Sequence, residues 1–117
     1  MRGSGSITLT SSMAIFSPPR RGGASVMNAA SGAVAVLGRS LAAELAPIRV
    51  NVLCPGVVNT GVWDETERTR LEAWARQSLP VGHLGQPDEL AQAILFLMTN
   101  PYVTGILLPV DGGLMLQ

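Results

Sequence analysis

The chain of 117 residues contains no lysine and only one cysteine, one histidine and one tyrosine. A single cysteine excludes an internal disulfide and any metal site made of several cysteines. Cys54 lies inside an apolar run, which is a position typical of a buried, unreactive thiol. We therefore expect no metal, and we expect a reducing, cytoplasmic setting for the protein.

Charged residues make up only 14% of the sequence, and eight acidic residues balance eight basic ones. The largest basic cluster is the pair Arg20-Arg21, which gives nucleic acid or an anionic membrane little to bind. No apolar run approaches the roughly 20 residues of a membrane span, and no signal-peptide pattern is present. The sequence therefore predicts neither nucleic acid nor a membrane as a partner.

Aromatic residues are scarce as well, at 4%, while the hydrophobic share is 47%. The core must therefore be aliphatic, and so little polar surface remains that part of the surface should be covered in a homo-oligomer. The length is that of one domain. Residues 1–5 are interpreted as an added or disordered start, and residues 6–117 carry the fold.

The stretch that organises the chain is residues 48–60, which read IRVNVLCPGVVNT. Its apolar run predicts a buried strand, and Pro55-Gly56 ends that strand in a loop because proline cannot extend a ladder. Further strands are predicted at residues 6–12 and 104–110.

Apolar residues at spacings of three and four predict helices over residues 26–45, 62–79 and 87–99. Breakers between residues 13 and 25 predict a surface loop. Gly32 and Gly38 lie inside the first helix, where each costs up to about 1 kcal/mol relative to alanine, so we expect them to pack closely against a neighbouring backbone, preferably a helix.

The second helix is rich in charge. Its acidic and basic residues stand at helical neighbour spacings and predict the ion pairs Glu65 with Arg68, Glu67 with Arg70, and Glu72 with Arg76. An apolar side would consist of Trp63, Leu71 and Trp74. This pattern fits a solvated helix with one packed stripe, and it also fits a mobile flap over a site.

Strands that alternate with helices indicate βαβ units and a parallel sheet. The predicted fold is a truncated, Rossmann-like, three-layer α/β fold with about three parallel strands. A long helix follows the first strand and further helices follow the second. Because ligands bind beyond the carboxyl ends of such strands, the Pro55-Gly56 loop is the place to expect a site.

Five blocks in order carry a resemblance to a known family: SITLTSS, GAVAVLGRSLAAELAP, IRVNVLCPGVVNT, LPVGHLGQPDELAQAILFLM and YVTGILLPVDGG. Together they resemble the C-terminal half of a short-chain dehydrogenase/reductase. The resemblance implies a seven-stranded parallel sheet of which this chain would supply the last three strands. It also implies NAD or NADP as cofactor.

The same resemblance suggests site residues. Ser12 falls where the family places the serine that hydrogen-bonds the substrate carbonyl or hydroxyl. Pro55, Gly56, Val58 and Thr60 match the loop beside the nicotinamide. The family's closing signature, matched here by residues 111–113, serves mainly structure and subunit contacts.

Two departures from the family pattern stand out. Met27 and Ser31 occupy the positions of the catalytic tyrosine and lysine, and neither side chain can replace them. No shift of register restores the pair, because the chain has no lysine and its one tyrosine is Tyr102. The family's glycine-rich cofactor turn is also missing. The resemblance thus predicts an NAD(P)-dependent oxidoreductase for a small carbonyl or alcohol, weak or inactive by the usual mechanism.

The family also forms oligomers through the long helix and through the last helix with the last strand. For this chain the matching faces contain Ala30, Val34 and Leu41, or Ile94, Leu97 and Leu107.

Two alternatives stay open. One is a non-catalytic, oligomeric fold remnant or small-molecule binder. The other is a hydrolase with Ser12 as nucleophile, His83 as base and Asp64 or Asp111 as the orienting acid. No G-x-S-x-G elbow supports the hydrolase, and His83 fits a plain loop residue.

Overall fold

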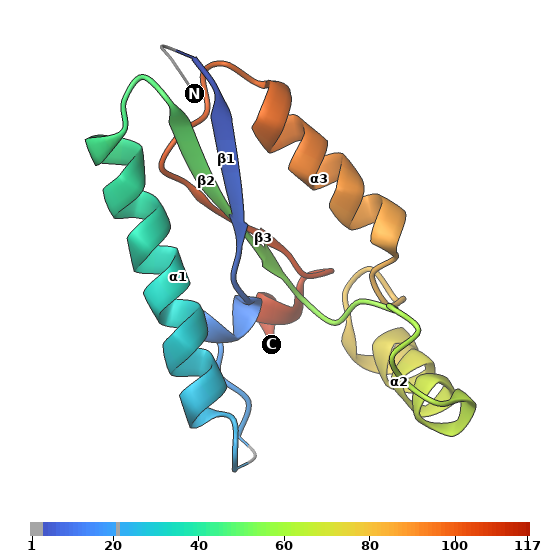
Figure 1. Cartoon of the computed structure of the whole chain (residues 1–117). Coiled ribbons are helices and arrows are strands. Elements are labelled where there is room, and N and C mark those ends of the chain that lie inside the picture. The colour runs from blue at the N-terminus through green and yellow to red at the C-terminus, as the bar shows by residue number, and fades with distance from the viewer. Residues whose placement is uncertain (1–3, 21) are drawn as a thin grey trace.

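Three parallel strands form one sheet in the computed structural model, which describes residues 4–20 and 22–117 (Figure 1). The strands are β1 (Ser6–Thr10), β2 (Arg49–Pro55) and β3 (Leu107–Val110), in the order β1-β2-β3. In register, Leu9 lies opposite Val52, and Val52 lies opposite Leu107. The predicted parallel sheet is confirmed. The expected start over residues 1–5 lies largely outside the described residues.

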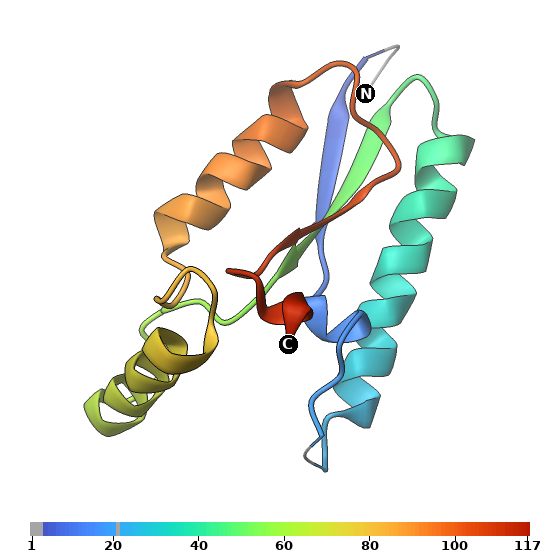
Figure 2. The same ribbon diagram turned by 180° about the vertical axis from the view of Figure 1, so that it is seen from behind.

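Helices cover both faces of this sheet. The three α-helices are α1 (Ser25–Glu44), α2 (Glu65–Ser78) and α3 (Pro87–Thr99). Figures 1 and 2 show α1 on one face, α3 on the other, and α2 beyond the carboxyl end of β2. The predicted order of strands and helices is therefore correct.

Local signals explain where α2 and α3 begin. The Asp64 carboxylate accepts a hydrogen bond from the Glu67 N–H at 2.8 Å and caps α2. In α3 a capping box joins Gln86 and Glu89, and Pro87 takes the first helical position. Of the three ion pairs predicted for α2, only Glu67 with Arg70 comes within reach in the described chain, at 3.9 Å.

The predicted surface loop over residues 13–25 was partly wrong. Met13–Ile15 form a 3₁₀ helix, and the Met13 side chain is buried. The Ser12 hydroxyl caps this turn by accepting the Ala14 N–H at 3.1 Å. An apolar side chain placed directly after a strand end could therefore turn back onto the core.

The central strand is the only one of the three that is buried along most of its length. Residues 50–54 of β2 are buried, whereas β1 and β3 are half-buried. One core cluster joins β2 to α3 through Leu53, Leu90 and Leu97. The second lies under α2, where Trp63, Leu71 and Trp74 pack as predicted against Ala75, Leu79 and Leu84.

The predicted oligomer faces coincide in part with this core. Leu97 is fully buried, and Ile94 packs against the same cluster, so Leu97 cannot contact another copy. Of the other predicted residues, Ala30 is exposed, and Val34, Leu41 and Leu107 are half-buried. The large exposed apolar side chains on these two helices are Val26, Met27, Val36 and Leu37 on α1, and Leu95, Phe96 and Met98 on α3. Neighbouring positions on the same helices therefore offer the apolar surface.

By length and composition alone, α1 could cross a membrane, since an 18-residue stretch of it has a mean hydropathy of 1.2. However, Ala35 and Gly38 on α1 are buried in the fold, where α1 covers β1 and β2. Packing on the sheet therefore accounts for part of its apolar character, while Val26, Met27, Val36 and Leu37 on the same helix are exposed.

Asn51 provides a first testable prediction about the fold. Its side chain is fully buried, donates to the Val103 carbonyl at 2.9 Å and accepts the Ile106 N–H at 3.3 Å. We expect Asn51→Leu to lower the free energy of unfolding by about 1–3 kcal/mol, because the fully buried amide loses both hydrogen bonds and the half-buried Ile106 N–H loses its acceptor.

Urea unfolding would measure this loss. Asn100→Ala is the matched control, since that side chain accepts one N–H, from Tyr102, at an exposed position. The control should cost clearly less than Asn51→Leu. Equal losses would contradict the role given to Asn51.

Candidate functional site

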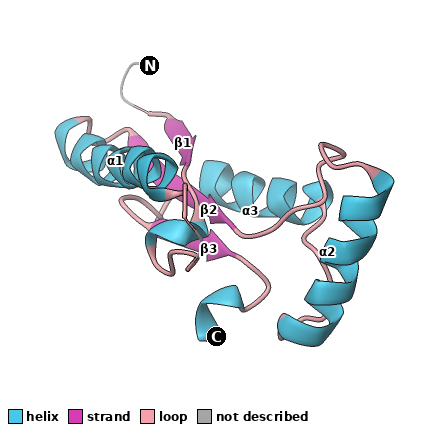
Figure 3. Cartoon of the chain, turned by 90° about the horizontal axis from the view of Figure 1, so that it is seen from below, coloured by secondary structure: helices cyan, strands magenta, loops and turns pink. Residues whose placement is uncertain are grey.

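The carboxyl ends of the three strands meet at one edge of the sheet (Figure 3, seen from that side). Ser11 and Ser12 follow β1, Gly56 follows β2, and Asp111 follows β3. This is where ligands bind in open α/β sheets. The structure thus brings Ser12 and the Pro55-Gly56 loop to the same edge, as predicted.

Gly56 fits this edge because it has no side chain. Its N–H donates to the Val110 carbonyl at 3.0 Å, and a Cβ atom would lie only 2.7 Å from the Asp111 Cα. The chain must pass so close to β3 that only glycine is accommodated. The loop beyond Pro55 is therefore held firmly against the sheet.

Val58 presents its backbone to the outside of this loop. Residues on either side bond to Gly85: the Asn59 N–H donates to the Gly85 carbonyl at 2.8 Å, and the Gly85 N–H donates to the Val57 carbonyl at 3.0 Å. In a parallel bridge of this kind the N–H and C=O of the middle residue point the opposite way. Val58 can therefore offer a donor and an acceptor to a ligand.

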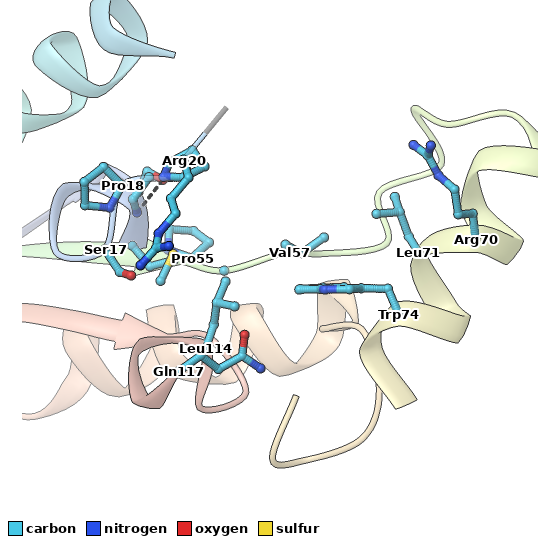
Figure 4. A pocket seen from close by; sticks show the side chains of 15 residues that line it. Ser17, Pro18, Arg20, Pro55, Val57, Arg70, Leu71, Trp74, Leu114 and Gln117 are labelled. Carbon is cyan, nitrogen blue, oxygen red and sulfur yellow. Dashed lines mark hydrogen bonds between the residues drawn. The ribbon is translucent and has the colours of Figure 1, made fainter. Parts of the chain in front are cut away.

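Two hollows flank the segment Pro55-Gly56-Val57, which lines both. The first, the Ser12 hollow, has a volume of about 680 Å³, and its lining residues include Ser12 and Trp74. Figure 4 shows this hollow, with Arg20 and Trp74 labelled. The second, the Thr60 hollow, has a volume of about 840 Å³ and includes Val58, Thr60 and Met27. Four of the five predicted site residues, Pro55, Gly56, Val58 and Thr60, thus line the Thr60 hollow, and Ser12 lies across the loop.

Ser12 keeps a free hydrogen despite its structural role. As the cap of the 3₁₀ helix its oxygen accepts the Ala14 N–H, while a hydroxyl still has one O–H to donate. Its neighbour Ser11 instead donates to the Ser31 carbonyl at 2.7 Å and ties β1 to α1. Ser12 can therefore cap the turn and donate to a ligand oxygen at the same time.

Met27 and Ser31 lie four residues apart on α1. Met27 is exposed and lines the Thr60 hollow, where a thioether can neither give nor take a proton. Tyr102 follows α3, whose C-terminal end lies at the opposite end of the sheet (Figure 1), and Tyr102 lines neither hollow.

The residues proposed for a hydrolase do not form a triad, because His83 and Asp111 line one hollow and Ser12 lines another. His83 lines a separate hollow of about 200 Å³, its Nδ1 donates to the Leu84 carbonyl at 2.8 Å, and its Nε2 lies 3.9 Å from the Glu89 carboxylate. Asp64 caps α2, and Asp111 accepts the N–H groups of Gly113 and Met115. The hydrolase interpretation is therefore not favoured.

Cys54 is fully buried in β2, as predicted. Loss of hydration on burial raises the pKa of its thiol, so the thiol stays protonated and unreactive at neutral pH. It takes no part in the site.

Most lining residues of the Ser12 hollow were not predicted as site residues, and among them are Arg20, Arg70 and Trp74. Arg20 lies on the segment that follows Ser12, while Arg70 and Trp74 lie on α2, which follows the Pro55-Gly56 loop. Segments that follow parallel strands return to the same edge, and this rule could have pointed to them.

A parallel sheet with helices on both faces, and with hollows at the carboxyl ends of its strands, defines a Rossmann-like α/β protein. A family model described as enoyl-(acyl carrier protein) reductase matches residues 1–115. The chain belongs to the short-chain dehydrogenase/reductase family, as its motifs predicted.

Similar proteins agree with this assignment. Carbonyl reductase family member 4 of Xenopus laevis is 40% identical over 97 residues, which are 81% of this chain and 39% of that protein. A small-chain dehydrogenase solved with NADPH matches with a TM-score of 0.86 and 37% identity over 100% of this chain and 53% of its own. A 3-oxoacyl-[acyl-carrier protein] reductase from Brucella melitensis, solved with NAD, has a TM-score of 0.78 and 32% identity over 94% and 40%.

The chain therefore spans about two fifths of the length of the curated relative and about half of the solved dehydrogenase.

Proposed function

We propose that the chain is the C-terminal half of a Rossmann-like domain, over residues 6–117, and serves an NAD(P)-dependent oxidoreductase for small carbonyl compounds or alcohols. One observation carries the proposal: Ser12 and Thr60 line two hollows on either side of the same rigid Pro55-Gly56-Val57 segment. One hollow would take the substrate and the other the nicotinamide end of the cofactor.

The residues of the Thr60 hollow fit that end of the cofactor. The outward N–H and C=O of Val58 match the donor and acceptor of a carboxamide, and the Thr60 hydroxyl could bind a phosphate oxygen. When bound, the nicotinamide supplies or accepts the hydride. The adenosine end would need residues beyond those described, and this agrees with relatives of about twice the length or more.

Neither Met27 nor Ser31 can act as a general acid for the reaction. Ser12 can donate a hydrogen bond to a substrate oxygen. By the family resemblance, however, Met27 stands in the place of the tyrosine that would protonate this oxygen, and Ser31 in the place of the lysine that orients the tyrosine. A positioned general acid is worth about 10²–10⁴ in rate. We therefore propose slow turnover, and the same absence of an acid favours a second candidate, a small-molecule binder without turnover.

We also propose that copies of the chain associate in the cytoplasm. The exposed apolar side chains on α1 and α3 support association. The lone buried thiol is compatible with a reducing compartment.

A titration with NADH and NADPH, followed by cofactor fluorescence, tests the proposal. We expect saturable binding, weakened about fivefold by Thr60→Ala, because one hydrogen bond is worth about 1 kcal/mol. Thr66→Ala is the matched control, since Thr66 is exposed at the start of α2 and lines neither hollow.

The titration separates the two candidates. No saturable binding at millimolar cofactor would rule out the oxidoreductase and leave the binder. Binding that Thr66→Ala weakens as much as Thr60→Ala would place the cofactor elsewhere.

A further inference from the structure

The Ser12 hollow combines positive charge with apolar walls. Its described lining residues include Arg20 and Arg70 but no aspartate or glutamate. A hollow with cations and no acid on its walls attracts an anion. The charge of the residues that line the hollow is therefore a better indication of the ligand than the shape of the hollow.

The two arginines differ in their setting. Both arginines are exposed, but Arg70 lies 3.9 Å from the Glu67 carboxylate, which partly neutralises its charge. Figure 4 shows Arg70 turned away from Trp74, whereas the Arg20 guanidinium is directed toward Ser17 and Pro55. Arg20 is therefore the better candidate to bind an anion inside the hollow.

The remaining walls suit a short apolar body. The apolar side chains of Met13, Val57, Leu71, Trp74 and Leu114 line the space between the two arginines. Its volume of about 680 Å³ lies within the range of about 300–1,000 Å³ of small-molecule sites. A ligand with one charged end and a compact apolar part would match both features.

We propose that the substrate is a carbonyl compound or alcohol that carries a carboxylate or phosphate on a short apolar body. Arg20 binds the anionic group, and the Ser12 hydroxyl donates to the carbonyl oxygen. A guanidinium presents two parallel N–H groups to such an anion, which sets its position as well as its affinity. This inference rests on the proposed oxidoreductase function, whose substrate class it names.

The cofactor's own phosphates are the competing use of Arg20. Arg20 lines the Ser12 hollow and is not among the described residues of the Thr60 hollow, where Thr60 itself lies. The geometry thus points to a substrate anion, and the experiment includes the cofactor as a separate arm.

The test compares 6-oxoheptanoate with its methyl ester, which keeps the ketone and removes the charge. Binding is measured without cofactor, by calorimetry and by tryptophan fluorescence in a Trp63→Phe background, which leaves Trp74 in the hollow as the one tryptophan. We expect the acid to bind about tenfold more tightly than the ester, and Arg20→Gln to remove that difference. Arg39→Gln, an exposed arginine on α1 that does not line the hollow, is the matched control and should preserve it.

Each other outcome overturns the inference. These are equal binding of acid and ester, no saturation by either up to 50 mM as an order-of-magnitude limit, and an equal loss in Arg39→Gln. A tenfold loss of NADPH affinity in Arg20→Gln, with acid binding unchanged, would assign Arg20 to the cofactor. Acid binding that persists while NADPH fails to bind would refute the oxidoreductase function and leave the anion site in place.

Discussion

Gly38→Ala should lower the free energy of unfolding by about 1–3 kcal/mol, although alanine is intrinsically the better helix former. Gly38 is buried where α1 crosses β2, and an added Cβ would overlap the Val52 Cγ2 atom. Val52 is fully buried and β-branched, so it has no freedom to move aside. The helix would have to shift away from the sheet.

Gly32→Ala is the control for this prediction. Gly32 lies on the same helix, yet an added Cβ would meet nothing within 4 Å. Alanine there should stabilise the chain by about 0.5–1 kcal/mol, because the helix loses a flexible residue. Urea unfolding of both variants at low protein concentration would measure the contrast, and effects of the same sign would contradict it.

The same pair probes the proposed association of copies. If a second copy packs its helix against α1 near Gly32, the stabilising effect of Gly32→Ala should reverse at high protein concentration. A methyl group would then push two helices apart. The Gly38 effect should not depend on concentration, because its partner Val52 belongs to the same chain.

These two glycines also show how far the sequence could predict the fold. Helical spacing placed both inside α1, and their cost in a helix correctly suggested a close contact for Gly38. The expectation was wrong for Gly32 in the described chain, and the neighbour of Gly38 is a strand side chain and not a helix. Spacing along one helix cannot tell which side of it faces the sheet when apolar residues surround it.

The site, too, could be predicted from the sequence only in part. Apolar runs ending at Ser12 and Pro55 placed those residues at one edge, because parallel strands end together. The lining by Arg20 escaped prediction, since it depends on how the loop after β1 folds back over that edge. The lining by Trp74 was anticipated only by the alternative in which the second helix lies over a site. Met13 shows the cause: its burial converts an expected surface loop into a capped turn.

Gly56→Ala should damage both fold and site. An added Cβ would lie 2.7 Å from the Asp111 Cα and 3.2 Å from the Asp111 carbonyl oxygen. These are backbone atoms, which cannot rotate away as a side chain can. We expect a loss of stability near the upper end of about 1–3 kcal/mol.

The loss at Gly56 should extend to ligand binding because the residue lines both hollows. Moving the loop away from β3 would displace Val58 and Thr60, and a loss of about 1.4 kcal/mol already weakens binding tenfold. We therefore expect NADPH affinity to fall at least about tenfold, measured at a temperature where circular dichroism shows the variant folded.

Gly22→Ala is the control for Gly56→Ala. Gly22 lies in the exposed loop before α1, and an added Cβ there would contact nothing within 4 Å. It should leave both unfolding and NADPH binding unchanged. If Gly56→Ala kept full NADPH affinity while destabilising the fold, the loop would matter for packing alone, and the cofactor could not lie against Pro55-Gly56-Val57 as proposed.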